Sequence, residues 1–545
     1  MVMSKNFLLV IFLFSALSSI KAFVVQDQGN FWPLPKSYVL YNSSIALKPS
    51  LFEFKVVQGD LNKCRILNEA FKRYSKIIGD SLSILLRHGQ SNRKYSHHHH
   101  HSPRQVLDPT KFLEHLEINF SGLCETLPYF GMNESYRLEV DNQRAPRTAI
   151  LSSRSVWGIL RGLETFTQLL EVSEDGLSLA VRSVSIDDSP RFSHRGLLID
   201  TSRHFLPVDT IKLIIDGMEA NKLNVLHWHI VDDQSFPYQS ELFPDLSGKG
   251  AYDSRLLVYT IADIQAIILY AAVRGVRVMP EFDTPGHTTS WGFGQPGLLT
   301  KCYNLVNEYG PVNPINEDNY SFLRDLFNEI IHIFPDGYLH LGGDEVNFDC
   351  WASNPEIRKW MANHNMSVDY AKLESFYIQK IVDIVEKEFR TSTIVWQEVF
   401  DNGVKLYNST IVQAWTGNYE KELDLITKAG HKALLSTCWY LDYLETGGDW
   451  KKYYKCEPLS FKGTAEQKQL VIGGEACMWG ESVDETNVVQ RIFPRASAAA
   501  EKLWSPQDDF RNIHQVESRL DVHTCRMKRR RIPAQPPNGP GFCLL

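Results

Sequence analysis

The stretch "GYLHLGGDE", Gly337–Glu345, joins an apolar run to two glycines and then to two adjacent carboxylates. Tyr338, Leu339 and Leu341 are typical of a buried strand. After Pro190 the same pattern recurs: apolar runs end in polar clusters and alternate with helix-like segments such as 208–222 and 261–275. The other runs are "RGLLIDTSRH" (195–204), "LNVLHWHIVDD" (223–233), "VRVMPEFDTPGH" (276–287), "STIVWQE" (392–398), "STIVQAW" (409–415), "KALLSTCWYLD" (432–442) and "LVIGGEACMWGE" (470–481). Eight strands alternating with helices predict an α/β fold, a closed parallel (β/α)8 barrel.

The chemistry of such a barrel lies at the carboxyl ends of its strands. Every predicted strand here ends in groups that can contact a polar ligand. These are Arg203; Asp232; His287; Asp344 and Glu345; Trp396 and Glu398; Trp415; Tyr440 and Asp442; and Trp479 and Glu481.

The chain around this barrel is long enough for more than one domain. It has 545 residues, 43% apolar and 22% charged, with a net charge of −7 that argues against a nucleic-acid binder. Residues 1–22 are predicted to be a signal peptide: Lys5 precedes the apolar run 7–17, and Ala22 offers a cleavage point. The alternative, a membrane anchor, is disfavoured because the run is short, and no later stretch is apolar enough to span a bilayer.

Residues 23–188 mix short strand-like and helical segments, which predicts a small α+β domain before a barrel domain at 189–545 with a C-terminal helical extension. The polar segment around His97–His101 could suggest metal binding, but a solvated loop or a tag remnant is the preferred interpretation. Six N-x-S/T sites agree with secretion: Asn42, Asn119, Asn133, Asn319, Asn365 and Asn408.

The nine cysteines also fit an oxidising compartment. Cys477 lies in an apolar run and is interpreted as a buried free thiol, whereas Cys438 and Cys456 are harder to assign. The other six are in loop-like segments and could pair: Cys64, Cys124, Cys302, Cys350, Cys525 and Cys543.

Two adjacent carboxylates in one partly dry cleft resist joint ionisation, so one pKa is expected to rise while the other stays low. Asp344 and Glu345 would then supply one proton donor and one fixed negative charge. The simpler alternative is that one of them caps the next helix. Three strand-end tryptophans, Trp396, Trp415 and Trp479, favour a sugar pocket with stacking walls, although a single Trp is more often core filling.

A metal site is the alternative chemistry. His227 and His229 would share one face of a strand, and Asp232, Asp233 and His287 could join them. However, His229 precedes the expected strand end, and no second His pair or bridging carboxylate completes the set. We therefore expect no metal and no cofactor.

From Trp32-Pro33-Leu34-Pro35 to its end, the chain resembles the lysosomal-type β-N-acetylhexosaminidases of glycoside hydrolase family 20. The segments that carry the resemblance are "RGLLIDTSRHFLPV", "NVLHWHIVDDQSFPYQS", "EFDTPGHTTSWG", "HLGGDEV", "WQEVF", "GGEACMWGE" and "FPRASAAAEKLW". The resemblance implies a retaining exo-glycosidase that removes terminal β-linked N-acetylglucosamine (GlcNAc) and N-acetylgalactosamine (GalNAc) from glycoconjugates or chito-oligosaccharides. Its nucleophile would be the 2-acetamido oxygen of the substrate, which forms an oxazolinium ion.

The resemblance also implies roles for individual residues. Asp344 would orient the acetamido group, and Glu345 would act as acid and then base. The supporting roles are Asp232 and His287 beside Glu345; Arg203 and Glu481 on the 3- and 4-hydroxyls; Trp396, Trp415 and Trp479 as walls; Tyr440 on the acetamido oxygen; and Asp442 on the 6-hydroxyl.

Further implications are the disulfides Cys64–Cys124, Cys302–Cys350 and Cys525–Cys543, a homodimer, and a lysosomal or secreted location. Two departures from the family pattern stand out. Cys438 replaces a small residue or proline and leaves a Cys438–Cys456 bridge open. Asp442-Tyr443 stands where the branch that accepts 6-sulfated sugars has Asn-Arg. A sugar-binding lectin without catalysis is the non-enzymatic alternative, but Asp344 and Glu345 are both present.

Overall fold

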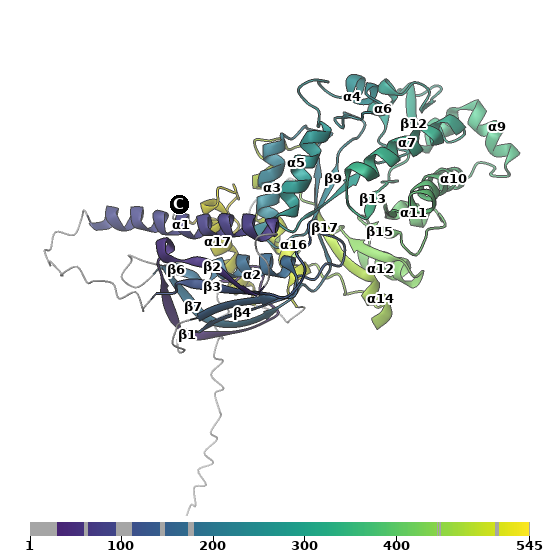
Figure 1. Ribbon diagram of the computed structural model, residues 1–545. Helices are drawn as coiled ribbons and strands as arrows, with labels where there is room; N and C mark the ends of the chain where they lie inside the picture. The colour runs from purple at the N-terminus through teal and green to yellow at the C-terminus, as the bar shows by residue number, and fades with distance from the viewer. Residues whose placement is uncertain are drawn as a thin grey trace, which may run out of the picture.

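The computed structural model describes residues 30–58, 64–93, 112–141, 148–172, 179–443, 445, 448–506 and 512–543. The predicted signal peptide and the His97–His101 segment lie outside these residues. The described chain folds into a sheet domain and a barrel domain, which lie side by side (Figure 1).

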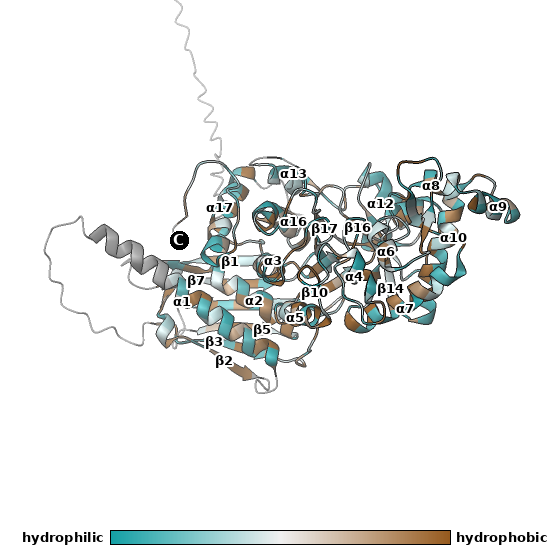
Figure 2. Ribbon diagram, turned by 90° about the horizontal axis from the view of Figure 1, so that it is seen from above, coloured by the Kyte–Doolittle hydropathy of each residue, from teal (hydrophilic) through white to brown (hydrophobic). Residues whose placement is uncertain are grey.

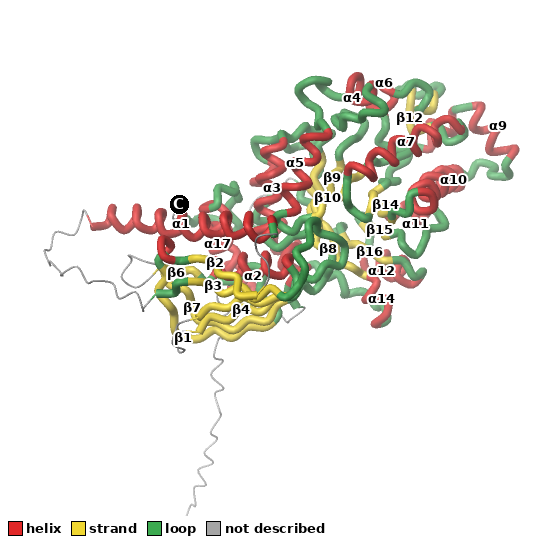
Figure 3. The backbone as a smooth tube through the Cα atoms, in the orientation of Figure 1, coloured by secondary structure: helices red, strands yellow, loops and turns green. Residues whose placement is uncertain are grey.

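Eight parallel strands close the barrel in the order β10-β13-β14-β15-β16-β17-β8-β9, which confirms the predicted fold class. Figure 3 shows these strands in yellow at the centre of the domain, with helices around them. Seven fall within the apolar runs identified in the sequence, and β8 begins one residue before its run: β8 His194–Asp200, β9 Val225–His229, β10 Arg277–Glu281, β13 Tyr338–His340, β14 Ser392–Trp396, β15 Ile411–Ala414, β16 Lys432–Leu435 and β17 Val471–Met478. Every residue of β8, β9 and β10 is buried, as expected for parallel strands covered on both faces.

Helices and a small hairpin surround these strands, and the last three helices follow β17. The hairpin pairs β11 (Leu299–Lys301) with β12 (Tyr309–Val312). The helices are α3 Val208–Ala220, α4 Asp245–Gly250, α5 Ile261–Ala272, α6 Thr289–Gly294, α7 Glu317–Ile333, α8 Phe348–Ser353, α9 Pro355–Asn363, α10 Tyr370–Asp383, a π-helical turn Ile384–Glu388, α11 Gln397–Asp401, α12 Tyr419–Lys428, α13 Trp450–Lys455, α14 Ala465–Leu470, α15 Val488–Ile492, α16 Arg495–Trp504 and α17 Ile513–Arg529.

The sheet domain is a mixed sheet in the order β1-β7-β4-β5-β3-β2, with β6 paired to β7. Alternate residues of β3 are buried, so one face of the sheet packs on helices. All of α2 is buried, because it lies between this sheet and the barrel, and α1 lies beside it (Figure 2). The bounds are β1 Ser37–Leu47, a 3-10 turn Pro49–Leu51, β2 Glu53–Gln58, α1 Arg65–Arg93, β3 His115–Phe120, β4 Tyr136–Asp141, β5 Thr148–Ser153, α2 Val156–Gln168, β6 Leu170–Val172 and β7 Leu179–Asp188.

Four disulfides are present in the structure. Three are the pairs that the resemblance implied: Cys64–Cys124, Cys302–Cys350 and Cys525–Cys543. The fourth, Cys438–Cys456, answers the question that the sequence left open, and Cys477 is a buried free thiol.

One of the six glycosylation positions does not fit the fold. Asn319 lies in α7, is 3% exposed, and donates its side-chain amide to the carbonyls of Leu298 and Asn313, both at 3.0 Å. An attached glycan is incompatible with this packing, so the prediction at Asn319 is wrong. Asn42, Asn133, Asn365 and Asn408 are exposed, and Asn119 is half-buried on β3. Among the described residues, no helix is both long and apolar enough to cross a bilayer.

Candidate active site

The two adjacent carboxylates follow β13 in an unusual backbone. Gly342 and Gly343 have φ angles of +66° and +96°, and Glu345 itself has φ +52°. A Cβ added at Gly342 would lie 1.7 Å from Asp283 Oδ1, so only glycine fits this turn. The backbone separates the two acids: Asp344 is 8% exposed, whereas the side chain of Glu345 is 60% exposed. The expectation that both share one partly dry cleft is therefore wrong for Glu345.

A chain of polar side chains leads from Glu345 into the protein. His287, which also has a left-handed backbone (φ +56°), places Nε2 3.7 Å from Glu345 Oε2 and Nδ1 3.1 Å from Asp232 Oδ1. Burial alone would lower the pKa of His287, but the neighbouring carboxylates, Asp283 first among them, raise it well above the usual range. The imidazole is therefore held as a cation that faces Glu345.

Arg203 lies on the other side of Asp232. Its guanidinium is 2.9 Å from Asp200 Oδ2 and 2.8 Å from Asp232 Oδ2, and it lies 3.7 Å from Glu481 Oε1. Burial opposes the charge, but the carboxylates of Asp200 and Asp232 outweigh it and raise the pKa of Arg203. Asp200 thus holds the charged guanidinium of Arg203 in place beside the pocket. No feature of the sequence pattern had identified Asp200 as a site residue.

Aromatic side chains from neighbouring strand ends gather next to these charges. Trp396 and Tyr440 are buried in one cluster, and Trp415 and Trp479 are partly buried against it. The rings of Trp415 and Tyr440 stack at 6.0 Å, and those of Trp396 and Trp479 lie 6.1 Å apart. Arg203 sits over the Trp479 ring at 5.2 Å, which joins the charged side of the site to the aromatic side.

Asp344 lies between these two sides. One of its oxygens is within 4.8 Å of ligand atoms of Asp283 and His287. Burial, followed by the charge of Asp344, raises the pKa of both Asp283 and Glu398. The Oδ1 atom of Asp344 is buried and has no hydrogen-bond partner among the described residues. A buried carboxylate oxygen without a partner is costly, so this atom is suited to accept a hydrogen bond from a ligand.

Asp442 is half-buried after β16, at the edge of this site. Burial raises the pKa of its carboxyl, and the nearby charge of Glu481 acts in the same direction. Nearby cations are already engaged: Arg495 bonds Asp449 at 2.7 Å, and Lys452 pairs with Glu445.

The structure also shows a buried layer that the sequence analysis missed. Glu281 on β10 accepts hydrogen bonds from Trp396 Nε1 at 2.8 Å and His229 Nδ1 at 2.7 Å, and lies 3.0 Å from His227 Nε2. His229 is the last residue of β9 and reaches Asp232 Oδ2 at 2.9 Å, so the expectation that it lies short of the site is wrong. The available signal in the sequence was Glu281 itself, an acidic residue within an apolar strand that follows a strand with two histidines.

Below Glu281 the network continues through Glu475 on β17. Its two oxygens lie 2.6 Å from His194 Nε2 and 2.7 Å from His227 Nδ1. Burial opposes these charges, but the paired histidines lower the pKa of Glu475, and the carboxylates raise the pKa of His227 to about 9. Alternating acids and imidazoles therefore run from Glu345 through the barrel interior.

Within the described part of the chain, three sets of side chains have the geometry to hold a metal ion: His227, Glu281 and His340; Asp232, Asp233 and His287; and Asp283, His287 and Asp344. In the first set Glu281 pairs with His227 and, at 3.2 Å, with His340; in the second, Asp232 bonds His287, and Asp233 accepts from the Thr289 amide at 2.9 Å. Asp283 accepts from the Gly343 amide at 2.8 Å. Hydrogen bonding accounts for the first two clusters, whereas Asp344 Oδ1 in the third remains without a partner among the described residues.

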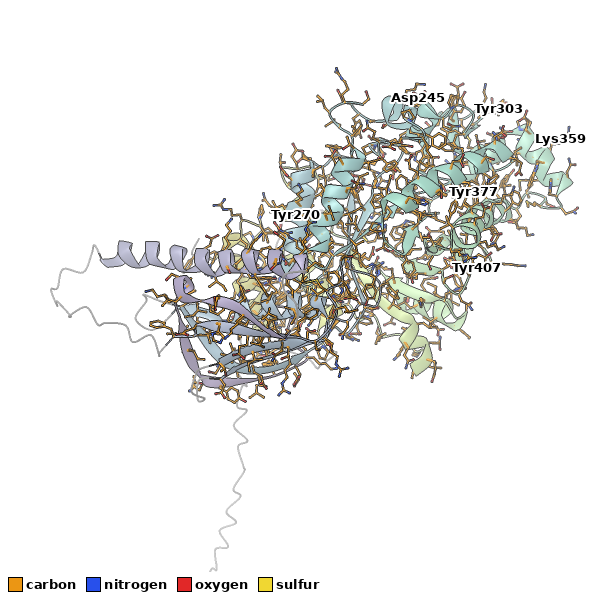
Figure 4. The ribbon with its side chains drawn as sticks, viewed as in Figure 1. Asp245, Tyr270, Tyr303, Lys359, Tyr377 and Tyr407 are labelled. Atoms are coloured by element: carbon orange, nitrogen blue, oxygen red, sulfur yellow. A yellow bond between two sulfur atoms is a disulfide. The ribbon has the colours of Figure 1, made fainter. Side chains whose placement is uncertain are left out.

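A cavity of about 410 Å³ opens on the outer side of Glu345. Its walls include His287, Tyr309, and the Cys302–Cys350 disulfide that ties the hairpin loop to α8. In Figure 4, Tyr303 marks this hairpin loop at the rim of the barrel. A group attached to the ligand could extend into this cavity from the acid.

Comparison with known proteins agrees with this geometry. The family model "Glycosyl hydrolase family 20, catalytic domain" matches residues 192–507, and "beta-acetyl hexosaminidase like" matches residues 31–169. The chain belongs to glycoside hydrolase family 20. It is an enzyme of the β-hexosaminidase type, which removes terminal GlcNAc by hydrolysis.

Among curated relatives, the chain is 48% identical to human beta-hexosaminidase subunit beta over 518 residues, covering 94% of this chain and 89% of that protein. It is 45% identical to the bovine subunit alpha over 521 residues, covering 94% of each. Among solved structures, the Flavobacterium johnsoniae chitobiase has a TM-score of 0.75 at 27% identity, covering 93% of this chain and 73% of that one.

Proposed function

We propose that this hydrolase uses a retaining, substrate-assisted mechanism on terminal β-GlcNAc and β-GalNAc, with Asp344 as the residue that positions the nucleophile. The observation that carries this proposal is the buried, unpartnered Oδ1 of Asp344 beside the aromatic wall. An acetamido N–H of the substrate would satisfy that oxygen. The negative charge of Asp344 would then stabilise the cation that forms when the acetamido oxygen attacks.

Glu345 is the proposed proton donor. Its proton passes to the glycosidic oxygen as the bond from that oxygen to C1 breaks and the bond from the acetamido oxygen to C1 forms. In the second step, Glu345 removes a proton from water, which attacks C1 and opens the oxazolinium ring to give the product with its original β configuration. The His287 imidazole near Glu345 and the Asp232 carboxylate behind it support both proton transfers.

Arg203 and Glu481 are the proposed partners of the 3- and 4-hydroxyls. Two carboxylates hold Arg203 firmly, whereas Glu481 is 56% exposed and 3.7 Å away from the guanidinium. A carboxylate with this freedom can follow a 4-hydroxyl that is equatorial in GlcNAc or axial in GalNAc. The rigid Arg203 and the more mobile Glu481 together support activity on both GlcNAc and GalNAc. Tyr440, with Trp396, Trp415 and Trp479, would enclose the acetamido group and the ring.

Two properties are proposed from the family resemblance. The first is a homodimer, which light scattering of the purified protein at several concentrations will test; a constant monomer mass would overturn it. The second is a lysosomal or secreted location, with glycoconjugates or chito-oligosaccharides as substrates. A panel of natural glycans, including glycolipid and glycosaminoglycan ends, separates these substrate classes.

Substrates with a fluorinated acetamido group test the nucleophile. Each fluorine withdraws electrons from the acetamido oxygen, so kcat/KM on aryl β-GlcNAc should fall steeply from acetamido to trifluoroacetamido. NMR of the first product formed should show the β anomer. Rates that do not depend on fluorination, or an α anomer as first product, would overturn the mechanism while leaving hexosaminidase activity intact.

Glu345→Gln tests the acid role. Turnover on a glycoside with a poor leaving group should fall about 10²–10⁴-fold, because a positioned general acid contributes that much. A phenolate leaving group needs less protonation, so activated aryl glycosides should lose less. Binding of a competitive inhibitor serves as the control for folding. Equal losses on activated and unactivated substrates would contradict the assignment.

A further inference from the structure

A second cavity lies where α1, α5 and α17 meet, and none of the catalytic-site residues named above lines it. Its volume is about 620 Å³, within the usual range of small-molecule sites. Tyr270, labelled in Figure 4, marks its barrel side on α5 near α1, and Ile77 lines it from α1. Both domains and the C-terminal helix contribute to its walls. We name it the α17 cavity.

The α17 cavity is strongly basic. Eight of its lining residues are arginine or lysine, and four are aspartate or glutamate. This excess contrasts with the net negative charge of the whole chain. The basic group includes a run from the end of α17, Arg529-Arg530-Arg531, one turn after Arg526.

Among the described residues, three of these cations pair with carboxylates. Arg73 pairs with Glu219 at 2.6 Å, Arg274 pairs with Asp216 at 2.7 Å, and Arg530 pairs with Glu164, also at 2.7 Å. These three pairs use two of the four acids in the wall and one from outside it. The two other wall acids, Asp80 and Glu171, are exposed at the rim.

Arg526 is different. Its guanidinium donates to the backbone carbonyls of Asn30 and Gln168, and no carboxylate of the described residues lies within ion-pair distance. Burial and then the charge of Arg530 lower the pKa of Arg526 to about 9. Its direct partners are neutral carbonyls, the carboxylates of Glu164 and Glu171 compensate its charge only in part, and the nearby charge of Arg530 adds repulsion. An anion in the cavity would relieve both costs.

We propose that the α17 cavity binds a small molecule with a multiply charged oxyanion group, of the phosphate or sulfate ester class. Guanidinium groups present paired N–H donors that match the oxygens of such groups, which favours this class over a halide or a single carboxylate. Because two domains and α17 line the cavity, the ligand would tie these parts together and raise the unfolding temperature.

Calorimetric titration of the full-length protein with inorganic pyrophosphate, at constant ionic strength, tests the proposal. Phosphate and sulfate are run in parallel to separate the two ester types, and citrate tests for binding by charge alone. We expect saturable binding of one pyrophosphate per chain and a higher unfolding temperature. Arg526→Gln should weaken binding about tenfold or more, because it removes a charge-assisted contact.

Two further variants keep the test decisive. Lys76→Gln alters an exposed side chain of the cavity wall and should weaken pyrophosphate binding severalfold even if Arg526→Gln fails to fold. Arg324→Gln removes an exposed arginine on α7, outside the cavity, and should leave binding unchanged. Hydrolysis of aryl β-GlcNAc should be unaffected by pyrophosphate and by Lys76→Gln. Absence of saturable binding, equal affinity in Lys76→Gln, or citrate binding as strong as pyrophosphate would overturn the proposal.

Discussion

Glu281 offers the sharpest test of how the barrel interior serves the site. It is fully buried, and its carboxylate links the indole of Trp396 to the imidazole of His229. We expect Glu281→Gln to lower activity through these two contacts rather than through loss of the fold. The substitution keeps the size of the side chain but removes its charge and one acceptor oxygen.

The magnitude follows from the contacts. A glutamine oxygen can accept from Trp396 or from His229, but its amide group must then face the other donor. Losing one hydrogen bond to a charged group costs about 1.5–3 kcal/mol. Removing one of the two carboxylates that pair with the buried His229 cation raises the total to about 3–5 kcal/mol of unfolding free energy. A displaced Trp396 or Asp232 should reduce kcat by roughly 10–100-fold, because misplacement by about 1 Å can cost that much.

Glu475→Gln is the matched control. Glu475 is equally buried and also pairs with the His227 cation, but its hydrogen bonds are with His194, His227 and Gln413 rather than with pocket residues. Urea unfolding should therefore show similar destabilisation in both variants, whereas kcat measured well below the unfolding transition should fall strongly only in Glu281→Gln. If the glutamine variant is too unstable, Trp396→Phe removes one of the two contacts that connect Glu281 to pocket residues. Parallel losses of kcat and stability in the two glutamine variants would refute the positioning role.

Three further outcomes are expected. Asp344→Asn should lose rate even on activated aryl glycosides and bind a thiazoline analogue of the oxazolinium ion much more weakly; unchanged inhibition would contradict its role. In Asp232→Asn, the pKa of His287 should fall toward its ordinary value of 6.5. His287 would then lose its positive charge at a lower pH than in the wild type, so the alkaline limb of the pH–rate profile should shift to lower pH. Identical profiles would exclude the coupling between Asp232 and His287. Substrates with neutral GlcNAc should be preferred over those with 6-sulfo-GlcNAc by about tenfold or more, because Asp442 repels the sulfate. A repulsion of ~1.4 kcal/mol is enough for a tenfold difference. The double variant Asp442→Asn, Tyr443→Arg should reduce this preference for the neutral sugar. Equal cleavage of the neutral and sulfated substrates by the wild type would show that C6 of the sugar does not face Asp442.

The barrel was predictable because strands buried on both faces read as continuous apolar runs, and each run here stops at a polar group. Arg203, Asp232 and His287 could be placed together by one rule, since the carboxyl ends of parallel strands meet at one end of a barrel. The same rule was not applied to Glu281, because the apolar run "RVMPEF" continues past it and hides that β10 ends at this residue. Its role depends on register: Glu281 is the Cα partner of both His229 and His340 on the neighbouring strands.

The different surroundings of Asp344 and Glu345 depend on backbone geometry that residue types only partly specify. Gly342 and Gly343 are residues from which a left-handed backbone can be predicted. Glu345 also adopts this backbone conformation although it is not glycine, which carries an energetic cost. His287 shares this unfavourable conformation and faces Glu345 across 3.7 Å. Two strained residues in contact at one site indicate that the surrounding packing holds the acid toward its imidazole, while Asp344 remains buried behind it. In the proposed mechanism, these two surroundings give the adjacent carboxylates different tasks: Glu345 is exposed toward the leaving group, and Asp344 is enclosed with the acetamido group.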